Sequence, residues 1–237
     1  MKTVILCGGK GTRLHEETEY KPKPMVLVGG KPILWHIMKL YSHYGFNDFV
    51  LCLGYKGEMI KDYFDKNKIP GWNIIFADTG LECQTGGRVA QIKKYLGEDE
   101  NFFLTYGDGV SNVDINKLLD FHKEKNKIVT LTGVRPVSPF GVLEIKDSLV
   151  KSFREKPKTD NWINGGFFVC NKKVFDFLSS DENCVLEQEP FRAIAAKSEL
   201  AVYCHDDFWQ CLDTFKDLKG LSYLYDKGER RWMVWES

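Results

Sequence analysis

The chain lacks an excess of either charge. Its 237 residues include 33 Lys and Arg and 33 Asp and Glu, so the formal net charge is zero. Proteins that bind nucleic acids or membrane surfaces electrostatically usually carry a basic excess. We therefore expect neither partner, and a phosphate-binding site would depend on where individual basic residues lie.

The sequence also lacks long apolar runs, cysteine motifs and histidine clusters. No run reaches transmembrane length, and the opening MKTVILCGG is too short for a signal-peptide core. The seven cysteines are odd in number and have no CxxC spacing, which argues against a disulfide framework or a zinc site. His36 and His43 share a predicted helix but have no third ligand nearby in sequence. We expect a cytoplasmic protein with buried free thiols.

Low-complexity linkers and internal repeats are absent, and the first half instead alternates strands with helices. Strands are predicted over 2–7, 48–53, 72–77 and 102–106, and helices over 32–41, 57–64, 87–95 and 114–125, the last capped by Asp114. This alternation predicts an α/β fold with a Rossmann-like, mostly parallel sheet flanked by helices.

The second half changes character. Strands are predicted over 128–134, 141–145, 149–153, 166–170 and 200–204, helices over 173–178 and 189–197, and a helical tail from 214. The short links between the first four strands favour antiparallel pairs beside the parallel sheet, as a β-rich insertion. We expect one domain, 1–237, made of a first half (1–127), a second half (128–213) and a C-terminal helical tail (214–237).

A glycine-rich loop, GGKGTR, follows the first strand. Ligands of doubly wound sheets bind at the carboxyl ends of strands, and glycines let backbone N–H groups turn toward an anion. The loop fits neither GxxxxGK[ST] nor GxGxxG, because the second pattern would end on Leu14. The prolines of the following KPKPM disfavour a helix, so an extended stretch can bring Lys21 and Lys23 back over the loop. Phosphate binding is predicted, and a simple turn with solvated charges is the alternative.

Together, GGKGTRL and KPKPM resemble the sugar-phosphate nucleotidylyltransferases, in particular their glucose-1-phosphate cytidylyltransferase branch. The resemblance continues in order through DTGLECQTGGRV, FFLTYGDGVSNVDI, SFREKPK, WINGGFFV, LEQEPFRAIA and FWQCLDTFKDL. It implies a nucleotide-diphospho-sugar transferase fold and an enzyme that transfers CMP from CTP to glucose 1-phosphate. The products would be pyrophosphate and CDP-glucose, for surface polysaccharide or deoxysugar biosynthesis.

Such a reaction calls for cations around two polyanions, and the resemblance implies Mg²⁺ as cofactor. Asp108 in YGDG and Asp213 in WQCLDT match the metal-binding aspartates. Taken alone, Asp108 would be a turn residue and Asp213 a helix N-cap.

For the nucleotide, Arg13, Lys23 and Asp108 are predicted as catalytic residues, while Lys10 and Lys21 would act through their field or be solvated. Base recognition is expected in TGLECQTGGR, although Gln84 alone could equally be a solvated loop residue. Cytosine, rather than another pyrimidine, rests on the resemblance. The predicted nucleotide-binding residues are Leu6, Gly8, Gly9, Gly11, Thr12, Arg13, Lys23, Gln84, Gly86, Gly87, Arg88, Tyr106 and Gly107.

For the acceptor, Lys156 matches a lysine that binds the sugar's phosphate, and Glu155 a residue that accepts hydrogen bonds from sugar hydroxyls. In isolation, EKPK would be an exposed charged turn. The predicted acceptor-binding residues are Gly141, Glu155, Lys156, Asn164, Gly165, Gly166 and Trp209.

One departure from the family pattern lies at residues 57–78, a segment that is longer in the branch and contributes to its subunit contacts. A homo-oligomer is expected, of open size. The acceptor is also open: another small phosphate such as phosphoglutamine, in capsule modification, is an alternative, as are UTP or dTTP as donors. A non-catalytic nucleotide-sensing protein is the alternative from another class.

Overall fold

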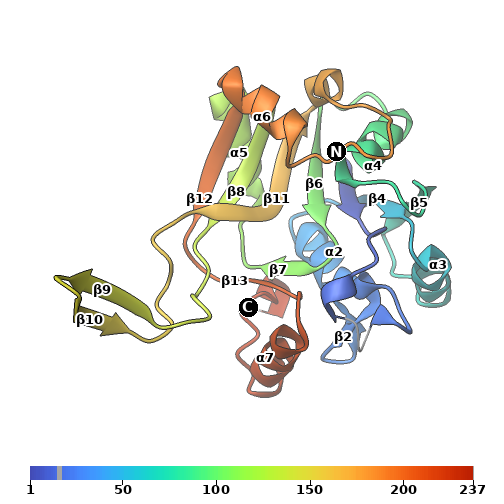
Figure 1. The fold of residues 1–237 in the computed structure, drawn as a ribbon. Coiled ribbons are helices and arrows are strands. Elements are labelled where there is room, and N and C mark those ends of the chain that lie inside the picture. Colours follow the sequence, from blue (N-terminus) through green and yellow to red (C-terminus); the bar gives the residue numbers. More distant parts are fainter. Residues whose placement is uncertain (15–17, 237) are drawn as a thin grey trace.

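A seven-stranded sheet forms the centre of the molecule (Figure 1). The computed structural model describes residues 1–14 and 18–236, except for the side chain of Arg13. The strands are β1 (Thr3–Leu6), β4 (Asp48–Leu53), β5 (Asn73–Asp78), β6 (Asn101–Tyr106), β8 (Val129–Val134), β11 (Ile163–Asn171) and β12 (Leu200–His205). Their order is β12-β8-β11-β6-β1-β4-β5, and only β11 runs antiparallel to its neighbours. The predicted α/β fold with a mostly parallel sheet is confirmed.

Helices cover both faces of this sheet. They are α2 (Ile33–His43), α3 (Gly57–Lys66), α4 (Thr85–Gln91), α5 (Ile115–Lys125), α6 (Glu189–Ala196) and α7 (Phe215–Asp226). Successive side chains of a strand point to opposite faces, so Val4 and Ile5 belong to two different apolar cores. Residues of α2, α3, α5 and α7 join the core of Ile5, and residues of α4 and α6 join that of Val4. The first strand, TVIL, is therefore buried on both faces, as its sequence predicts.

Two helix starts test the caps expected from the sequence. The Asp114 side chain accepts a hydrogen bond from the Lys117 N–H, so the predicted cap of α5 is confirmed. At α7, Thr214 is the cap and forms a capping box with Asp217, which leaves Asp213 outside the helix. The alternative interpretation of Asp213 as an N-cap is therefore wrong.

Two predicted helices differ from the structure. The helix over 87–95 begins earlier, at Thr85, and its last residues form a 3-10 turn, Ile92–Tyr95. The segment over 173–178 is a 3-10 turn, Lys172–Phe177. No helix in the described ranges is both long and apolar enough to cross a bilayer.

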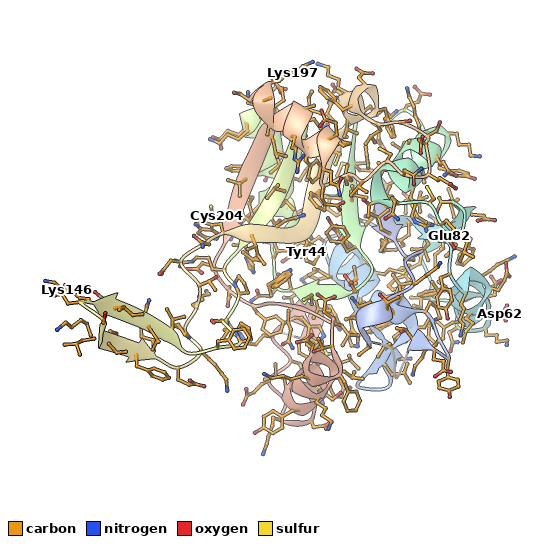
Figure 2. The ribbon with its side chains drawn as sticks, viewed as in Figure 1. Tyr44, Asp62, Glu82, Lys146, Lys197 and Cys204 are labelled. Atoms are coloured by element: carbon orange, nitrogen blue, oxygen red, sulfur yellow. The ribbon has the colours of Figure 1, made fainter. Side chains whose placement is uncertain are left out.

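The strands β9 (Val142–Lys146) and β10 (Leu149–Arg154) form a two-stranded arm that projects from the body, with Lys146 at its far end (Figures 1 and 2). They pair only with each other, and every residue of β9 is exposed. The predicted antiparallel pairing of these strands is confirmed, but the prediction that they lie beside the parallel sheet is wrong. Strand β11 does join that sheet as an antiparallel strand.

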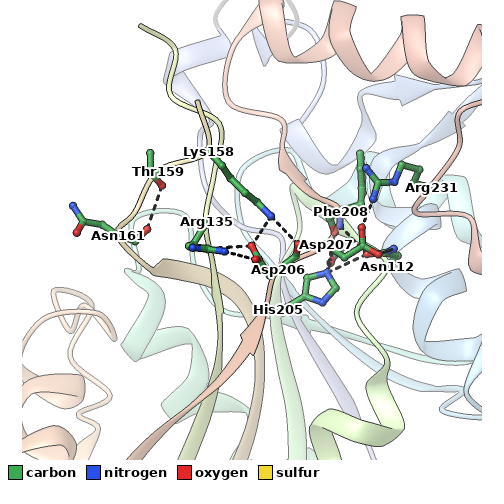
Figure 3. Close-up of polar contacts among 11 residues, drawn as sticks. Asn112, Arg135, Lys158, Thr159, Asn161, His205, Asp206, Asp207, Phe208 and Arg231 are labelled. Atoms are coloured by element: carbon green, nitrogen blue, oxygen red, sulfur yellow. Dashed lines mark hydrogen bonds and ion pairs between the residues drawn. The ribbon is translucent and has the colours of Figure 1, made fainter. Parts of the chain in front are cut away.

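Ion pairs anchor the root of this arm (Figure 3). Arg135, just before the arm, and Lys158, just after it, both pair with the Asp206 carboxylate. Hydrogen bonds from these two side chains lower the pKa of Asp206 to about 2. The neighbouring Asp207 accepts hydrogen bonds from Asn112 and Arg231. The arm is therefore held at its base by the turn that follows β12.

Candidate active site

Two adjacent cavities lie at the carboxyl ends of β1 and β6, where a doubly wound sheet binds its ligands. The first, of about 240 Å³, is called the glycine-loop cavity, and its lining is Leu6, Cys7, Gly8, Gly9, Gly11, Lys23, Pro24, Cys83, Gln84, Thr85, Arg88, Tyr106, Gly107 and Asp108. The second, of about 350 Å³, is called the β11 cavity, and its lining is Thr105, Tyr106, Asp108, Gly109, Ile163, Asn164, Gly165, Phe167, Trp209, Cys211 and Asp213. Tyr106 and Asp108 line both, so the cavities share a wall.

Most predicted residues line one of these cavities, but several do not. Of the nucleotide set, Thr12, Gly86 and Gly87 lie outside the lining of the glycine-loop cavity. Of the acceptor set, Asn164, Gly165 and Trp209 line the β11 cavity, and Trp209 Nε1 donates to the Gly165 carbonyl at 2.7 Å. The side chain of Arg13 lies outside the described part of the structure.

The remaining acceptor residues, Gly141, Glu155, Lys156 and Gly166, line neither cavity. The first three lie at the root of the arm. The Lys156 ammonium is 3.4 Å from the Glu155 carboxylate, and the two side chains are 54% and 60% exposed. The prediction that these three line one pocket with Asn164 is therefore not met in this conformation.

Lys23, Asp108 and Asp213 meet at the shared wall. The Lys23 ammonium lies 2.6 Å from Asp108 Oδ2 and 2.6 Å from Asp213 Oδ1, and its side chain is only 9% exposed. Burial by itself lowers the pKa of Lys23, but the Asp108 and Asp213 carboxylates outweigh burial and raise it. The lysine is therefore held charged between two carboxylates.

A short strand pair, missed by the sequence prediction, brings the two aspartates together. β7 (Gly109–Ser111) pairs antiparallel with β13 (Trp209–Cys211), and the Leu212 N–H donates to the Asp108 carbonyl at 2.8 Å. Three-residue strands are too short for a recognisable alternation of apolar and polar residues. In the sequence, this strand pair is marked only by the glycines around Asp108 and the tryptophan before Asp213.

The segment that carries Lys23 folds back over the glycine loop, as predicted, but as a 3-10 turn (Lys23–Met25) rather than an extended stretch. Gly11 has a φ of +63°, and a Cβ there would lie 3.1 Å from the Lys23 Cβ. Only glycine combines that backbone conformation with so close an approach. The loop and the lysine are thus packed together.

The two carboxylates can hold a divalent cation. Both place an oxygen within 2.6 Å of the same ammonium nitrogen, so they converge on one point. Carboxylate oxygens suit Mg²⁺, which commonly takes one or two carboxylates and completes its shell with water and substrate phosphates. The described ranges contain no group of three or more His, Cys, Asp or Glu side chains arranged for a metal. The donor set fits Mg²⁺ in the presence of a phosphate ligand.

Arg88 shapes the glycine-loop cavity. Its side chain is buried, and its terminal nitrogens donate to the carbonyls of Leu53, Gly8, Gly80 and Leu81 and to the Thr79 hydroxyl. A Cβ at Gly8 would lie 2.1 Å from Arg88 Nη1. Because its terminal nitrogens donate to acceptors from separate segments, Arg88 fixes the loop, and its role in reading a base edge stays a prediction.

Gly86 and Gly87 also have neighbours other than a base. Their N–H groups both donate to the Cys184 carbonyl, and a Cβ at Gly86 would lie 2.6 Å from the Cys184 sulfur. These glycines therefore allow α4 to pack closely against the segment before α6.

Lys10 of the glycine loop pairs with Glu82 at 2.7 Å. The ion pair joins the glycine loop to the 79–84 loop, so Lys10 is not simply solvated.

Comparisons with known proteins identify the family of this chain. Residues 2–227 match the family model described as Nucleotidyl transferase. The chain is 46% identical to the glucose-1-phosphate cytidylyltransferase of Salmonella typhimurium, with 100% of both chains covered, and 46% identical to the "Probable glucose-1-phosphate cytidylyltransferase" of Bacillus subtilis, with 99% of this chain and 100% of that protein covered. The crystal structure of HddC from Yersinia pseudotuberculosis superposes with a TM-score of 0.74 at 24% identity, covering 94% of this chain and 99% of HddC. This last likeness concerns the fold alone.

Proposed function

The chain belongs to the nucleotidyl transferase family, and we propose that it transfers CMP from CTP to glucose 1-phosphate, releasing CDP-glucose and pyrophosphate. The observation that carries the proposal is the meeting of Lys23, Asp108 and Asp213 at the wall between two cavities. A relative with 46% identity over the full chain bears the name of this activity. Two anionic substrates that react with each other need adjacent pockets with positive charge between them, which Lys23 and a Mg²⁺ held by the two aspartates would supply together.

In the proposed reaction, CTP occupies the glycine-loop cavity and glucose 1-phosphate the β11 cavity. A phosphate oxygen of the sugar attacks the α-phosphorus, the bond from that phosphorus to the β-phosphate oxygen breaks, and pyrophosphate leaves. The buried Lys23 ammonium stabilises the charge that develops on the α-phosphoryl oxygens, because electrostatic stabilisation is strong in a site from which water is largely excluded. Arg88 keeps the glycine loop in place while the backbone N–H groups of Gly8, Gly9 and Gly11 face the triphosphate.

Asp108 and Asp213 would hold Mg²⁺, which neutralises phosphate charge when bound. Lys23 pairs with both carboxylates. When a metal binds to the aspartates, the lysine would be free to contact the phosphates instead. Arg13 is assigned to the triphosphate, and Lys156 and Glu155 to the acceptor's phosphate and hydroxyls. These two side chains reach the β11 cavity only if the arm root turns toward it. We further propose a cytoplasmic homo-oligomer that supplies CDP-glucose for surface polysaccharide or deoxysugar synthesis.

A screen of donors against acceptors tests the function. CTP, UTP and dTTP are each incubated with glucose 1-phosphate and with phosphoglutamine in the presence of Mg²⁺, and pyrophosphate release is measured. We expect the largest release from CTP with glucose 1-phosphate, and a CDP-glucose peak in mass spectra. Release from another pair alone would refute the proposed substrates. CTP binding by calorimetry without turnover of any acceptor would favour the nucleotide sensor.

A further inference from the structure

Glu187, which the sequence analysis did not single out, connects the two cavities without lining either. Its Oε2 accepts a hydrogen bond from the Thr85 hydroxyl at 2.7 Å, and its Oε1 accepts one from the Tyr106 hydroxyl. Thr85 lines the glycine-loop cavity, and Tyr106 lines both cavities. No ion pair to Glu187 is found among the residues that the structure describes. Within the described part of the chain, the carboxylate between the two pockets is therefore held by hydroxyl groups alone.

The hydrogen bonds around Glu187 have only one possible direction. An ionised carboxylate only accepts, so both hydroxyls must donate to it. The Thr85 oxygen in turn accepts from the Leu186 N–H at 2.9 Å, and the Tyr106 oxygen accepts from Asn164 Nδ2 at 3.1 Å. Each hydroxyl is thus satisfied on both sides, and neither can reverse without losing a partner.

Asn164, which lines the β11 cavity, is oriented by these hydrogen bonds. Its Nδ2 donates to Tyr106, and its Oδ1 accepts from the Gly166 N–H at 3.0 Å. A flipped amide would place an oxygen against an oxygen and an N–H against an N–H. The amide is therefore locked with one N–H and one lone pair left for a ligand. That pair of groups matches a sugar hydroxyl, which both donates and accepts.

The Tyr106 ring, which joins Glu187 to Asn164, is held in place by close packing. A Cβ at Gly166 would lie 2.4 Å from the Tyr106 ring, and the ring meets Phe168 edge-on with centroids 5.6 Å apart. Burial, together with the Glu187 carboxylate, raises the pKa of the Tyr106 hydroxyl well above its usual value. The phenol therefore keeps the proton that it donates to Glu187.

We propose that Glu187 is a positioning residue that couples the two cavities, because it fixes through Tyr106 the Asn164 amide that binds the acceptor. The proposal rests on the proposed function, since it assigns the β11 cavity to the sugar phosphate. Glutamine has the same shape as glutamate but supplies a donor where one hydroxyl needs an acceptor. Loss of the charge should therefore loosen Asn164 although neither cavity is touched directly.

The test compares steady-state constants of Glu187→Gln with those of Glu189→Gln, a matched control at the exposed first residue of α6. At saturating CTP, Glu187→Gln should raise the KM for glucose 1-phosphate about tenfold, the loss expected for a hydrogen bond to a charged group. At saturating glucose 1-phosphate, the same variant should change the KM for CTP less than about twofold. Glu189→Gln should leave both constants within about twofold of the wild type. The double variant Glu187→Gln with Tyr106→Phe should have the same KM for glucose 1-phosphate as Glu187→Gln alone. Both changes break the same series of hydrogen bonds from Glu187 through Tyr106 to Asn164.

A second pair tests the same chain from the nucleotide side, in case Glu187→Gln does not fold. Thr85→Val removes the hydroxyl and Thr85→Ser keeps it, so the KM for glucose 1-phosphate should be about fivefold higher in the valine variant. Equal acceptor KM values in wild type, Glu187→Gln and both Thr85 variants, with CDP-glucose still formed, would overturn the coupling alone. If the wild type uses a different acceptor, the proposed function fails and these ratios, measured with that acceptor, decide the coupling. A protein that turns over no acceptor overturns both.

Discussion

The glycine loop and the β9–β10 arm both carry predicted ligand-binding residues, but they differ in how the protein holds them. The loop is fixed by a buried arginine, a steric limit at Gly8 and the packed Lys23. Nearly every residue of the arm is exposed, and the ion pairs that anchor it within the described ranges lie at its root. Rigid positioning suits the reacting phosphates, whose alignment decides the rate. An anchored but otherwise free segment suits a part that adjusts when the acceptor enters.

The largest expected effect concerns the rigid side of this comparison. Lys23→Met removes the charge at the shared wall and should lower kcat about 10²–10³-fold, the loss typical of removing one group that stabilises transition-state charge. Pyrophosphate release measures the rate, and circular dichroism checks the fold. Lys68→Met, at an exposed lysine, is the control and should turn over at the wild-type rate. Wild-type turnover in Lys23→Met would remove this lysine from the reaction.

The second effect compares one residue type in both regions. Arg88→Met removes the hydrogen bonds that join Gly8, Leu53 and the turn at 79–81, and should lower the free energy of unfolding by about 3–5 kcal/mol. Arg154→Met acts on the arm, where the side chain is 54% exposed and lies 3.7 Å from Asp160, and should change it by less than about 0.5 kcal/mol. Urea unfolding measures both. Similar losses in the two variants would mean that the arm is packed as tightly as the loop.

Two neighbouring glycines of the loop, Gly8 and Gly9, differ in how closely Arg88 packs against them. Gly8→Ala places a Cβ 2.1 Å from Arg88 Nη1, whereas a Cβ at Gly9 meets nothing within 4 Å. We expect Gly8→Ala to lower the free energy of unfolding by about 1–3 kcal/mol through overpacking, and Gly9→Ala to change it by less than about 0.5 kcal/mol. Thermal unfolding compares the two. Equal melting temperatures would contradict a loop held by Arg88.

The smallest effect concerns the arm root and depends on pH. Arg135 and Lys158 hold the pKa of Asp206 at about 2, below its unfolded value, so this anchor is present above pH 4 and is lost as the pH falls toward 2. Asp206→Asn should reproduce that loss at neutral pH. Hydrogen exchange should then become faster in residues 142–154 and stay unchanged in β1. Unchanged exchange in the arm would show that other contacts anchor it.

The rigid region is also where sequence prediction succeeded. A mostly apolar run that ends in glycines predicts a strand buried on both faces and a ligand loop, because both properties are local. The cap at Asp114 is local for the same reason. The role of Arg88 in fixing the loop could not be predicted, because its acceptors come from separate segments, around Gly8, Leu53 and Thr79, that only the folded chain brings together.

The arm shows the opposite limit. Val142, Leu143 and Ile145 look like a sheet strand, yet all three are exposed, because no other strand of the described chain pairs with β9 except β10. Glu187 escaped notice because a glutamate in LEQEP has no local mark of function. Its role depends on two hydroxyls that are 102 and 81 residues away in sequence.

The most direct test of the central claim, that two adjacent cavities meeting at Lys23 hold the two halves of one product, is a crystal structure with CDP-glucose bound. The account predicts cytidine in the glycine-loop cavity, the glucosyl group beside Asn164 in the β11 cavity, and the diphosphate at Lys23. Electron density for the ligand elsewhere, or for both halves in a single cavity, would contradict it.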